Sequence, residues 1–171
     1  MIHLFWTELW LAESLVRNAY EIHKVLWRFF PNHNQRDFLF LVIERKNGHG
    51  AKVLLQSISK PIIEDSISGE NAVLRESKDL SGLLLRGGQQ LRFRLVANPT
   101  KKIKDQNDPE RAIRVPHIGD ENQIAWLKRK LEGIAHIYHA ESANLEPIYF
   151  SKSGHRGKIQ PVLFTGVLEV E

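Results

Sequence analysis

A β-hairpin between residues 38 and 59 is the feature that most restricts how this chain can fold. The segment FLFLVIER, from Phe38 to Arg45, is short, aromatic and β-branched, as strands are. The segment AKVLLQSIS, from Ala51 to Ser59, returns with a similar character. Between them, KNGHG contains Asn-Gly, the strongest short turn signal. The sequence therefore predicts two paired strands in the first half of the chain.

A strand and a helix precede this hairpin. Residues 2–11 form an apolar-rich run with strand character, and residues 18–30 predict a helix. After the hairpin, Pro61 opens a segment that predicts a short helix, and residues 72–85 fit either a strand or a helix. The order β-α-β-β-(α)-β indicates a ferredoxin-like sheet with helices on one face.

The second half of the chain repeats part of this order. The segment QLRFRLVAN, which starts at Gln90, predicts a strand with one solvated face. We interpret residues 98–116 as a long polar connection, and residues 119–135 as an amphipathic helix with Asp120 as its N-cap. Two predicted strands joined by a basic turn complete the order, at residues 146–154 and 158–171.

We therefore predict an α+β protein with two tandem ferredoxin-like (RRM-like) domains, divided at Gly87-Gly88. The first domain spans residues 1–86. The second spans residues 89–171 and is an unfinished copy of the first, incomplete at its C-terminus. A chain of 171 residues with 42% hydrophobic and 26% charged residues suits soluble globular domains.

The composition also indicates the cellular compartment in which the protein works. No apolar run approaches the ~18 residues that cross a bilayer, so we expect no membrane association. The N-terminal segment lacks a basic region and reaches Glu8 early, which argues against a signal peptide. Cysteine is absent, which excludes disulfides and thiolate metal sites and suits the reducing cytoplasm.

The net charge of +4 lies entirely in the second half of the chain. Residues 1–85 hold 10 Lys and Arg against 10 Asp and Glu, whereas residues 86–171 hold 14 against 10. This modest excess favours nucleic acid only slightly over a well-solvated surface. We interpret the basic run at residues 128–130 as a solvated helix face, and the run at residues 101–104 has that reading too.

One histidine on the predicted first helix is a candidate for chemistry. Tyr20, His23 and Trp27 run along the border between its apolar face and its charged face. An imidazole at such a border is partly desolvated, and its ordinary pKa of ~6.5 lets it give or accept a proton near neutrality. The residues alone favour the other interpretation, a structural histidine hydrogen-bonded at the edge of the core.

The segment SKSGHRGKIQ is a candidate phosphate-binding turn. It places Lys152, His155, Arg156 and Lys158 on one glycine-bearing turn between two strands. Such a turn suits contacts to a nucleic-acid backbone, and a merely solvated turn fits the pattern equally well. The sequence contains no Walker loop, no nucleophile elbow and no carboxylate–histidine cluster with metal spacing, so we expect neither a metal nor another cofactor.

Taken in order, several blocks of this sequence resemble the CasE family of CRISPR repeat endoribonucleases, subunits of the type I-E Cascade complex. The blocks are YEIHKVLWRFFP, RDFLFLVIER, KVLLQS, LRFRLVANPTK, IRVP, QIAWLKRKL and YFSKSGHRGKIQPVLFTGVLEV. The resemblance spans essentially the whole chain. It implies two tandem ferredoxin-like domains and metal-independent cutting of CRISPR precursor RNA at the 3′ base of the repeat hairpin. It also implies that the family continues beyond the strand matching residues 162–170.

The resemblance assigns roles to residues of this chain. The family pattern Y-x-x-H-x-x-L-W is matched at residues 20–27, which makes His23 the expected catalyst, with Tyr20 beside it. The expected partners are the CRISPR repeat RNA hairpin and other Cascade subunits. The candidate RNA-binding residues are Lys24, Lys101, Lys102, Arg114, Lys152, His155, Arg156, Lys158 and Gln160.

The implied reaction needs few protein groups. The 2′-OH next to the scissile phosphate attacks it, and the products are a 2′,3′-cyclic phosphate and a 5′-OH. His23 serves either as base to the 2′-OH or as acid to the leaving oxygen, and lysines offset the charge of the transition state. Two alternatives stay open: a non-catalytic RNA-binding subunit of the same complex, and an unrelated ferredoxin-like module that binds protein.

Overall fold

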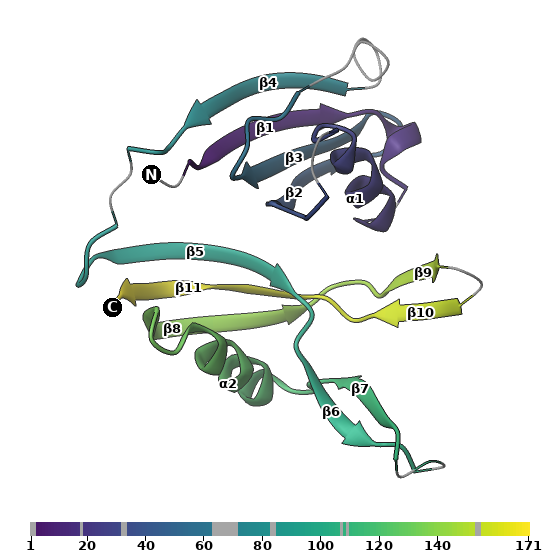
Figure 1. Cartoon of the computed structure of the whole chain (residues 1–171), viewed down its shortest axis with the longest axis vertical. Coiled ribbons are helices and arrows are strands. Elements are labelled where there is room, and N and C mark those ends of the chain that lie inside the picture. Colours follow the sequence, from purple (N-terminus) through teal and green to yellow (C-terminus); the bar gives the residue numbers. More distant parts are fainter. Residues whose placement is uncertain are drawn as a thin grey trace. The chain divides into compact units, whose positions relative to one another are not determined.

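The chain forms two compact units, residues 1–84 and 85–171, in a computed structural model. Figure 1 colours both units along the sequence. The described residues are 3–17, 19–31, 34–62, 72–82, 85–106, 108, 110–152 and 155–171. The prediction of a short helix after Pro61 falls on residues 63–71 for the most part and so lies outside the described residues.

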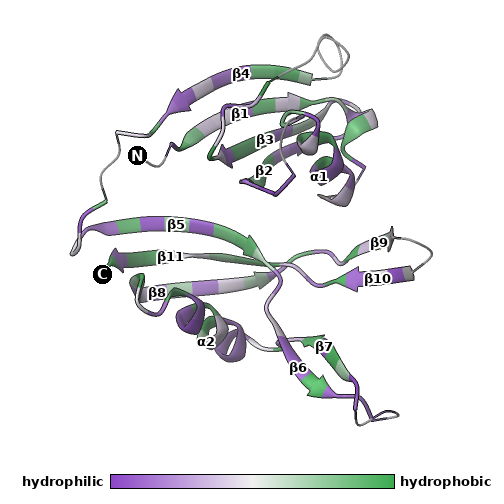
Figure 2. Ribbon diagram, in the orientation of Figure 1, coloured by the Kyte–Doolittle hydropathy of each residue, from purple (hydrophilic) through white to green (hydrophobic). Residues whose placement is uncertain are grey.

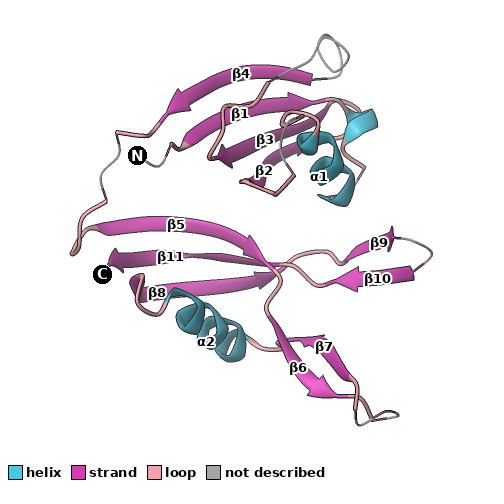
Figure 3. Ribbon diagram, in the orientation of Figure 1, coloured by secondary structure: helices cyan, strands magenta, loops and turns pink. Residues whose placement is uncertain are grey.

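The first unit is a four-stranded antiparallel sheet with helix α1, Ala19–Trp27, on one face (Figure 3). A short 3-10 helix, Glu13–Leu15, precedes α1. The strand order is β2-β3-β1-β4, which is the antiparallel order of a ferredoxin-like sheet. The strands are β1 Phe5–Leu11, β2 Phe38–Lys46, β3 Gly50–Ser57 and β4 Ala72–Asp79.

The core of this unit lies between α1 and the sheet. Alternate side chains of β1 and β3 point to the core, as the strand period of two requires, and Leu9 and Val53 are fully buried. The helix predicted over residues 18–30 is shorter in the structure, because α1 ends at Trp27. Its apolar face is confirmed, since Ile22 and Leu26 are fully buried, and Phe29, just past the end of the helix, is buried as well. The helix therefore holds its charged face towards solvent and its border residues beside the sheet.

The predicted hairpin is confirmed, and its turn depends on glycine. Gly48 has a φ of 75° and Gly50 a φ of 108°, a region that other residues rarely adopt. A Cβ atom at Gly50 would lie 2.0 Å from the carbonyl oxygen of Leu11, so the turn approaches β1 too closely for any side chain. The ambiguous segment after residue 72 forms strand β4.

The second unit is built on a three-stranded antiparallel sheet with the order β5-β11-β8. Helix α2, Asp120–Leu131, covers one face and packs against β8 (Figure 1). Leu127, Ile137, Val162 and Phe164 form the core. Hydrophilic and hydrophobic residues alternate along much of β5 (Figure 2), as predicted for a strand with one solvated face. The strands are β5 Gln90–Ala97, β8 Ala135–Asn144 and β11 Val162–Val170.

Two short hairpins extend from this sheet. Both lie in segments for which the sequence predicted a different structure. The segment predicted as a long polar loop contains β6, Thr100–Lys104, paired with β7, Ala112–Pro116. The predicted strand at residues 146–154 instead contributes β9, Ile148–Lys152, to a hairpin with β10, His155–Ile159. The predicted strand at 158–171 is interrupted between β10 and β11, because Pro161 offers no N–H to a sheet.

Strand β8 was not predicted, and the predicted cap of α2 is wrong. Most of β8 is polar and exposed, since it lies at an edge of the sheet, and its hydrophobic pattern is correspondingly weak. Gly119, with a φ of 84°, is the N-cap of α2, and its carbonyl accepts the first helical hydrogen bond from Gln123 N at 3.1 Å. The Asp120 carboxylate instead accepts a hydrogen bond from Ser142 Oγ at 3.0 Å.

Candidate functional site

His23 lies half-buried on α1 in a shell of aromatic rings. Its ring centroid is 5.8 Å from that of Phe38 and 6.4 Å from that of Phe40, both on β2. Trp27 meets the imidazole edge-on at 6.2 Å, with an interplanar angle of 84°. The predicted border position is therefore confirmed: the imidazole is wedged between its own helix and the first strand of the hairpin.

A direct hydrogen bond joins His23 to Trp27. The indole Nε1–H donates to His23 Nε2 over 3.0 Å. An indole nitrogen can only donate, so Nε2 must present its lone pair. In this arrangement His23 is neutral and carries its proton on Nδ1, which makes Nδ1–H the donor that remains for another group.

Arg36 is a cation beside this imidazole that the sequence did not single out. Its Nε donates to the carbonyl oxygen of Phe38 at 2.8 Å, and its guanidinium lies over the Phe38 ring, 5.4 Å from the centroid. The pKa of His23 lies below its ordinary value, first because burial disfavours the charged ring and second because Arg36 is positive. Burial also lowers the pKa of Arg36.

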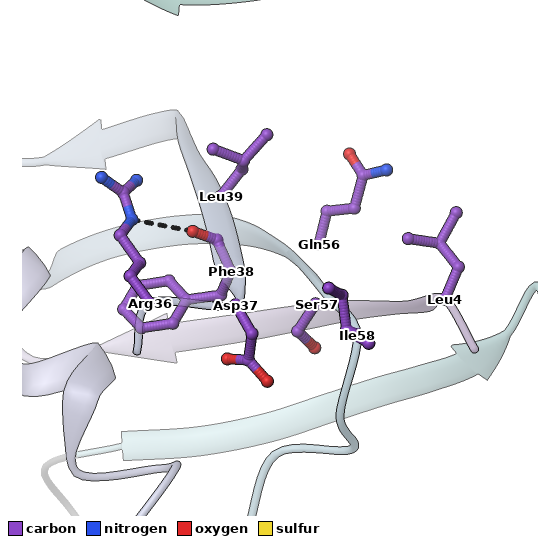
Figure 4. Close-up of a pocket in the computed structure, with 8 residues that line it drawn as sticks. All are labelled: Leu4, Arg36, Asp37, Phe38, Leu39, Gln56, Ser57 and Ile58. Carbon is purple, nitrogen blue, oxygen red and sulfur yellow. Dashed lines mark hydrogen bonds between the residues drawn. The ribbon is translucent and has the colours of Figure 1, made fainter. Parts of the chain in front are cut away.

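The same arginine lines a pocket of about 370 Å³ at the end of the sheet where β2 begins and β3 ends (Figure 4). In the figure, Leu39 and Gln56 point to one side of the ribbon and Asp37 to the other, with the Arg36–Phe38 hydrogen bond dashed. Arg36 and Phe38 thus belong both to the surroundings of His23 and to the pocket wall. The lining residues are Leu4, Arg36, Asp37, Phe38, Leu39, Gln56, Ser57 and Ile58.

Tyr20 and Lys24 lie on the same helix as His23. The Nζ of Lys24 lies 5.1 Å from the centroid of the Tyr20 ring and forms an ion pair of 2.8 Å with Glu21. Both partners of this ion pair are more than a third exposed, so it adds little to stability. The Lys24 ammonium thus lies at the solvent-exposed surface of α1, paired with Glu21.

The hairpin β6–β7 gathers three of the predicted RNA-binding residues. Lys102 and Arg114 are directly opposite each other, so their exposed side chains share one face. Lys101 points to the other face, where its charge acts on His117. The pKa of His117 is lowered first by burial, then by Lys101 and then by Arg129. Arg129, in the run interpreted as a solvated face, therefore belongs to the same electropositive region.

The hairpin β9–β10 holds the other predicted RNA-binding residues. The residue pairs are Lys152 with His155, Ser151 with Arg156 and Tyr149 with Lys158. Lys158 Nζ lies 5.8 Å from the centroid of the Tyr149 ring, and the Arg156 side chain is exposed. The side chains of Lys152 and His155 lie outside the described residues, as does the turn at 153–154.

Gln160 and Gly157 shape this hairpin. Gln160 Nε2 donates to the carbonyl oxygen of Leu145 at 2.7 Å, which closes the base of the hairpin and leaves the amide oxygen for another partner. Gly157 pairs with Phe150, whose ring covers it: a Cβ at Gly157 would lie 2.3 Å from Phe150 Cζ. A side chain at this position would displace the Phe150 ring.

The predicted residues thus form three groups. Tyr20, His23 and Lys24 share α1 in the first unit, while the remaining candidates lie on two basic hairpins of the second unit. In the described part of the chain, no three histidine or carboxylate side chains gather as a metal site. No helix among the described residues has the length and apolar character of a membrane span.

The sequence of this chain is similar to CRISPR-associated proteins. Residues 7–171 match the model of a family described as CRISPR associated protein. The chain is 40% identical to the Cascade subunit CasE of Escherichia coli K12, over 94% of this chain and 81% of that protein.

Two solved structures are similar to this chain over most of their length. The crystal structure of Cas6e from Escherichia coli K-12 has a TM-score of 0.78 and 37% identity, over 97% of this chain and 84% of that one. Thermus thermophilus Cse3, bound to an RNA representing a pre-cleavage complex, has a TM-score of 0.74 and 27% identity, over 98% and 85%. The predicted α+β fold of ferredoxin-like domains is confirmed, and the chain belongs to the CasE family of CRISPR-associated proteins.

Proposed function

We propose that this chain is a metal-independent endoribonuclease that processes CRISPR precursor RNA. It cuts at the 3′ base of the repeat hairpin, stays bound to the mature guide RNA and joins the other subunits of Cascade in the cytoplasm. The observation that carries the proposal is His23, a half-buried imidazole beside a cation, on the helix that holds the family pattern. The relatives named as CasE and Cse3, one of them bound to RNA before cleavage, support it.

The chemistry uses the substrate as its own nucleophile. The 2′-OH loses its proton, its oxygen bonds to phosphorus, and the bond to the 5′-oxygen breaks as that oxygen takes up a proton. The products are a 2′,3′-cyclic phosphate and a 5′-OH. Because the attack is intramolecular, holding the RNA in line supplies a large part of the rate. His23 moves one of the two protons, and proton transfer by a positioned side chain contributes roughly 10²–10⁴-fold.

Arg36 and Tyr20 complete this site in our proposal. A guanidinium has five N–H donors, and within the described part of the chain Nε donates to the Phe38 carbonyl, so the terminal nitrogens are suited to a phosphate oxygen. The negative charge that develops on the phosphorane-like transition state lies where such a fixed cation is most effective. Tyr20, one turn before His23, offers a hydroxyl to an RNA oxygen beside the imidazole.

The two basic hairpins of the second unit bind the RNA stem. Double-stranded RNA is recognised mainly through its backbone and shape, which suits exposed cations on projecting hairpins. Lys102 and Arg114 present two charges on one face of β6–β7, and Arg156 and Lys158 present two on β10. Lys24, Lys101, Lys152, His155 and Gln160 are the other proposed contacts.

A non-catalytic RNA-binding subunit is the second candidate. One observation favours it: His23 Nε2 already accepts the indole hydrogen bond, so the nitrogen that would take a proton is occupied. Membership of the CasE family removes the third hypothesis, an unrelated protein-binding module.

Incubation of the chain with a hairpin repeat RNA in EDTA separates the two candidates. Cleavage with a cyclic phosphate terminus supports the endoribonuclease. A mobility shift without cleavage supports the non-catalytic subunit, and the absence of both rejects RNA processing by this chain.

A further inference from the structure

We propose that Trp27 is a positioning residue that keeps the resting His23 imidazole neutral and protonated on Nδ1, and that His23 takes up a proton at Nε2 only after this hydrogen bond opens. The consequence for cleavage rests on the proposed function. The structural part concerns Trp27 and His23 alone and is testable without RNA.

The helix builds this pair. Residues four apart on an α-helix lie one above the other, so position 27 places its side chain against position 23. The indole Nε1–H points at His23 Nε2 over 3.0 Å, a normal hydrogen-bond length, and the edge-on contact of the rings follows from that direction. A donor aimed at Nε2 favours the tautomer with a lone pair there and opposes the imidazolium, which has none to offer.

The other groups around His23 also favour the neutral imidazole. Phe38 and Phe40 on β2 pack against the imidazole and present no titratable group, while Arg36, just before β2, presents a positive charge. On α1 itself, the neighbouring titratable groups are Tyr20, Lys24 and Glu21, which is ion-paired with Lys24. Burial and Arg36 hold the pKa of His23 below its ordinary value, and the indole hydrogen bond adds to this preference for the neutral ring.

This arrangement has a consequence for proton transfer. A neutral imidazole protonated on Nδ1 can accept a proton only at Nε2. If the proton of the 2′-OH moves there, the new N–H faces the indole N–H and the hydrogen bond is lost. The indole then needs another acceptor, and the non-bridging oxygens of the scissile phosphate are of the right chemistry. Binding of the RNA would thus free Nε2 as the indole turns to the phosphate.

Nitrogen-15 NMR of the imidazoles tests the pair directly. The full chain is labelled at its eight histidines, and the His23 signals are assigned by their loss in His23→Gln. We expect wild-type His23 to show a protonated Nδ1 and an unprotonated Nε2 at pH 7.5. In Trp27→Phe, which keeps an aromatic ring but lacks the donor, the Nδ1–H population should fall and the pKa of His23 should rise.

Phe40→Leu is the matched control. It removes a ring packed on His23 and leaves the indole donor in place, so the pKa should rise while the Nδ1–H tautomer persists. Should Trp27→Phe fail to fold, benzothienylalanine at position 27 keeps the shape of the indole and replaces its N–H by sulfur. A wild-type His23 signal protonated on Nε2 would overturn the proposal. It would also be overturned if His23 kept the same tautomer and the same pKa in the variant that lacks the indole N–H.

The RNA arm uses a 2′-deoxy hairpin that resists cleavage. Its binding should shift the Nε2 signal of the wild type and move the indole N–H signal of Trp27, whereas an unmoved indole signal would overturn the opening step. Because the tautomer is measured without RNA, a chain that does not cut RNA rejects the proposed function and leaves the test of Trp27 intact.

Discussion

Arg36 is bound to the residue whose ring it covers: its Nε donates to the carbonyl oxygen of Phe38 at 2.8 Å while its guanidinium lies 5.4 Å from the centroid of that ring. The Phe38 side chain is buried and packs in turn against His23. Two contacts to one anchored residue therefore fix a positive charge beside the imidazole.

The pH dependence of cleavage should report this charge. Burial and Arg36 lower the pKa of His23. The change in cleavage rate that reports the titration of His23 should therefore have its midpoint below pH 6.5. A rate that rises with pH through the midpoint identifies His23 as a base, because the neutral ring is then active. A falling rate identifies an acid. Arg36→Gln removes the positive charge and should move the midpoint upwards.

Single-turnover rates measured with the chain below saturation, at constant ionic strength, report the pKa of the RNA-free chain and provide this measurement. Arg45→Gln, at an exposed position on β2, removes an equal charge and should leave the midpoint in place. A midpoint that does not respond to Arg36→Gln would show that Arg36 does not act on the titration of His23.

His23→Ala should abolish detectable cleavage, because a proton transfer worth roughly 10²–10⁴-fold is lost. Hairpin binding should stay within about tenfold, or ~1.4 kcal/mol, since the stem contacts lie on other residues. Gel-based cleavage and filter binding measure the two effects. His49→Ala, at the exposed β2–β3 turn, is the control and should cut normally. Full cleavage by His23→Ala would place the catalyst elsewhere.

Cleavage should persist in EDTA and stop when the scissile nucleotide carries 2′-deoxyribose. The nucleophile in the proposed reaction is the 2′-OH, so its removal leaves no group to attack the phosphorus. Mass spectrometry of the normal product should show the cyclic phosphate. If the deoxy substrate were cut, or if EDTA stopped the reaction, the intramolecular metal-independent mechanism would be rejected.

Neutralising Arg156 and Lys158 together should weaken hairpin binding across repeat sequences. Each lost phosphate contact should flatten the log–log dependence of affinity on salt by somewhat under one unit. The matched control is Lys128→Gln with Lys130→Gln, which removes the same charge from the exposed face of α2. Equal affinity and an equal salt slope in both double variants would exclude β10 from the RNA-binding surface.

Leu26→Ala should lower the free energy of unfolding of the first unit by about 2–5 kcal/mol, because its fully buried side chain joins α1 to the sheet. Leu39→Ala, at a side chain 56% exposed, should change it by no more than about 0.5 kcal/mol. Urea unfolding followed by circular dichroism measures both. Similar losses in the two variants would contradict the position of α1 on the core.

The sequence by itself determined the elements whose signal is local. The hairpin at residues 38–59 follows from β-branched runs and an Asn-Gly turn, and the buried face of α1 follows from the helical spacing of Ile22 and Leu26. The border position of His23 follows from the same repeat. Each of these depends on neighbours within a few residues, which any chain with this sequence brings together.

Only the tertiary structure decided the elements and contacts that join distant residues. Strand β8 has a polar sequence and exists because β11 offers it a row of hydrogen-bonding partners. Hairpin β6–β7 likewise pairs through its backbone along exposed polar arms. Arg36 reaches His23 only because β2 packs against α1, and Phe38 and Phe40 lie against the imidazole for the same reason. Packing directs these side chains, and no local pattern in the sequence records that direction.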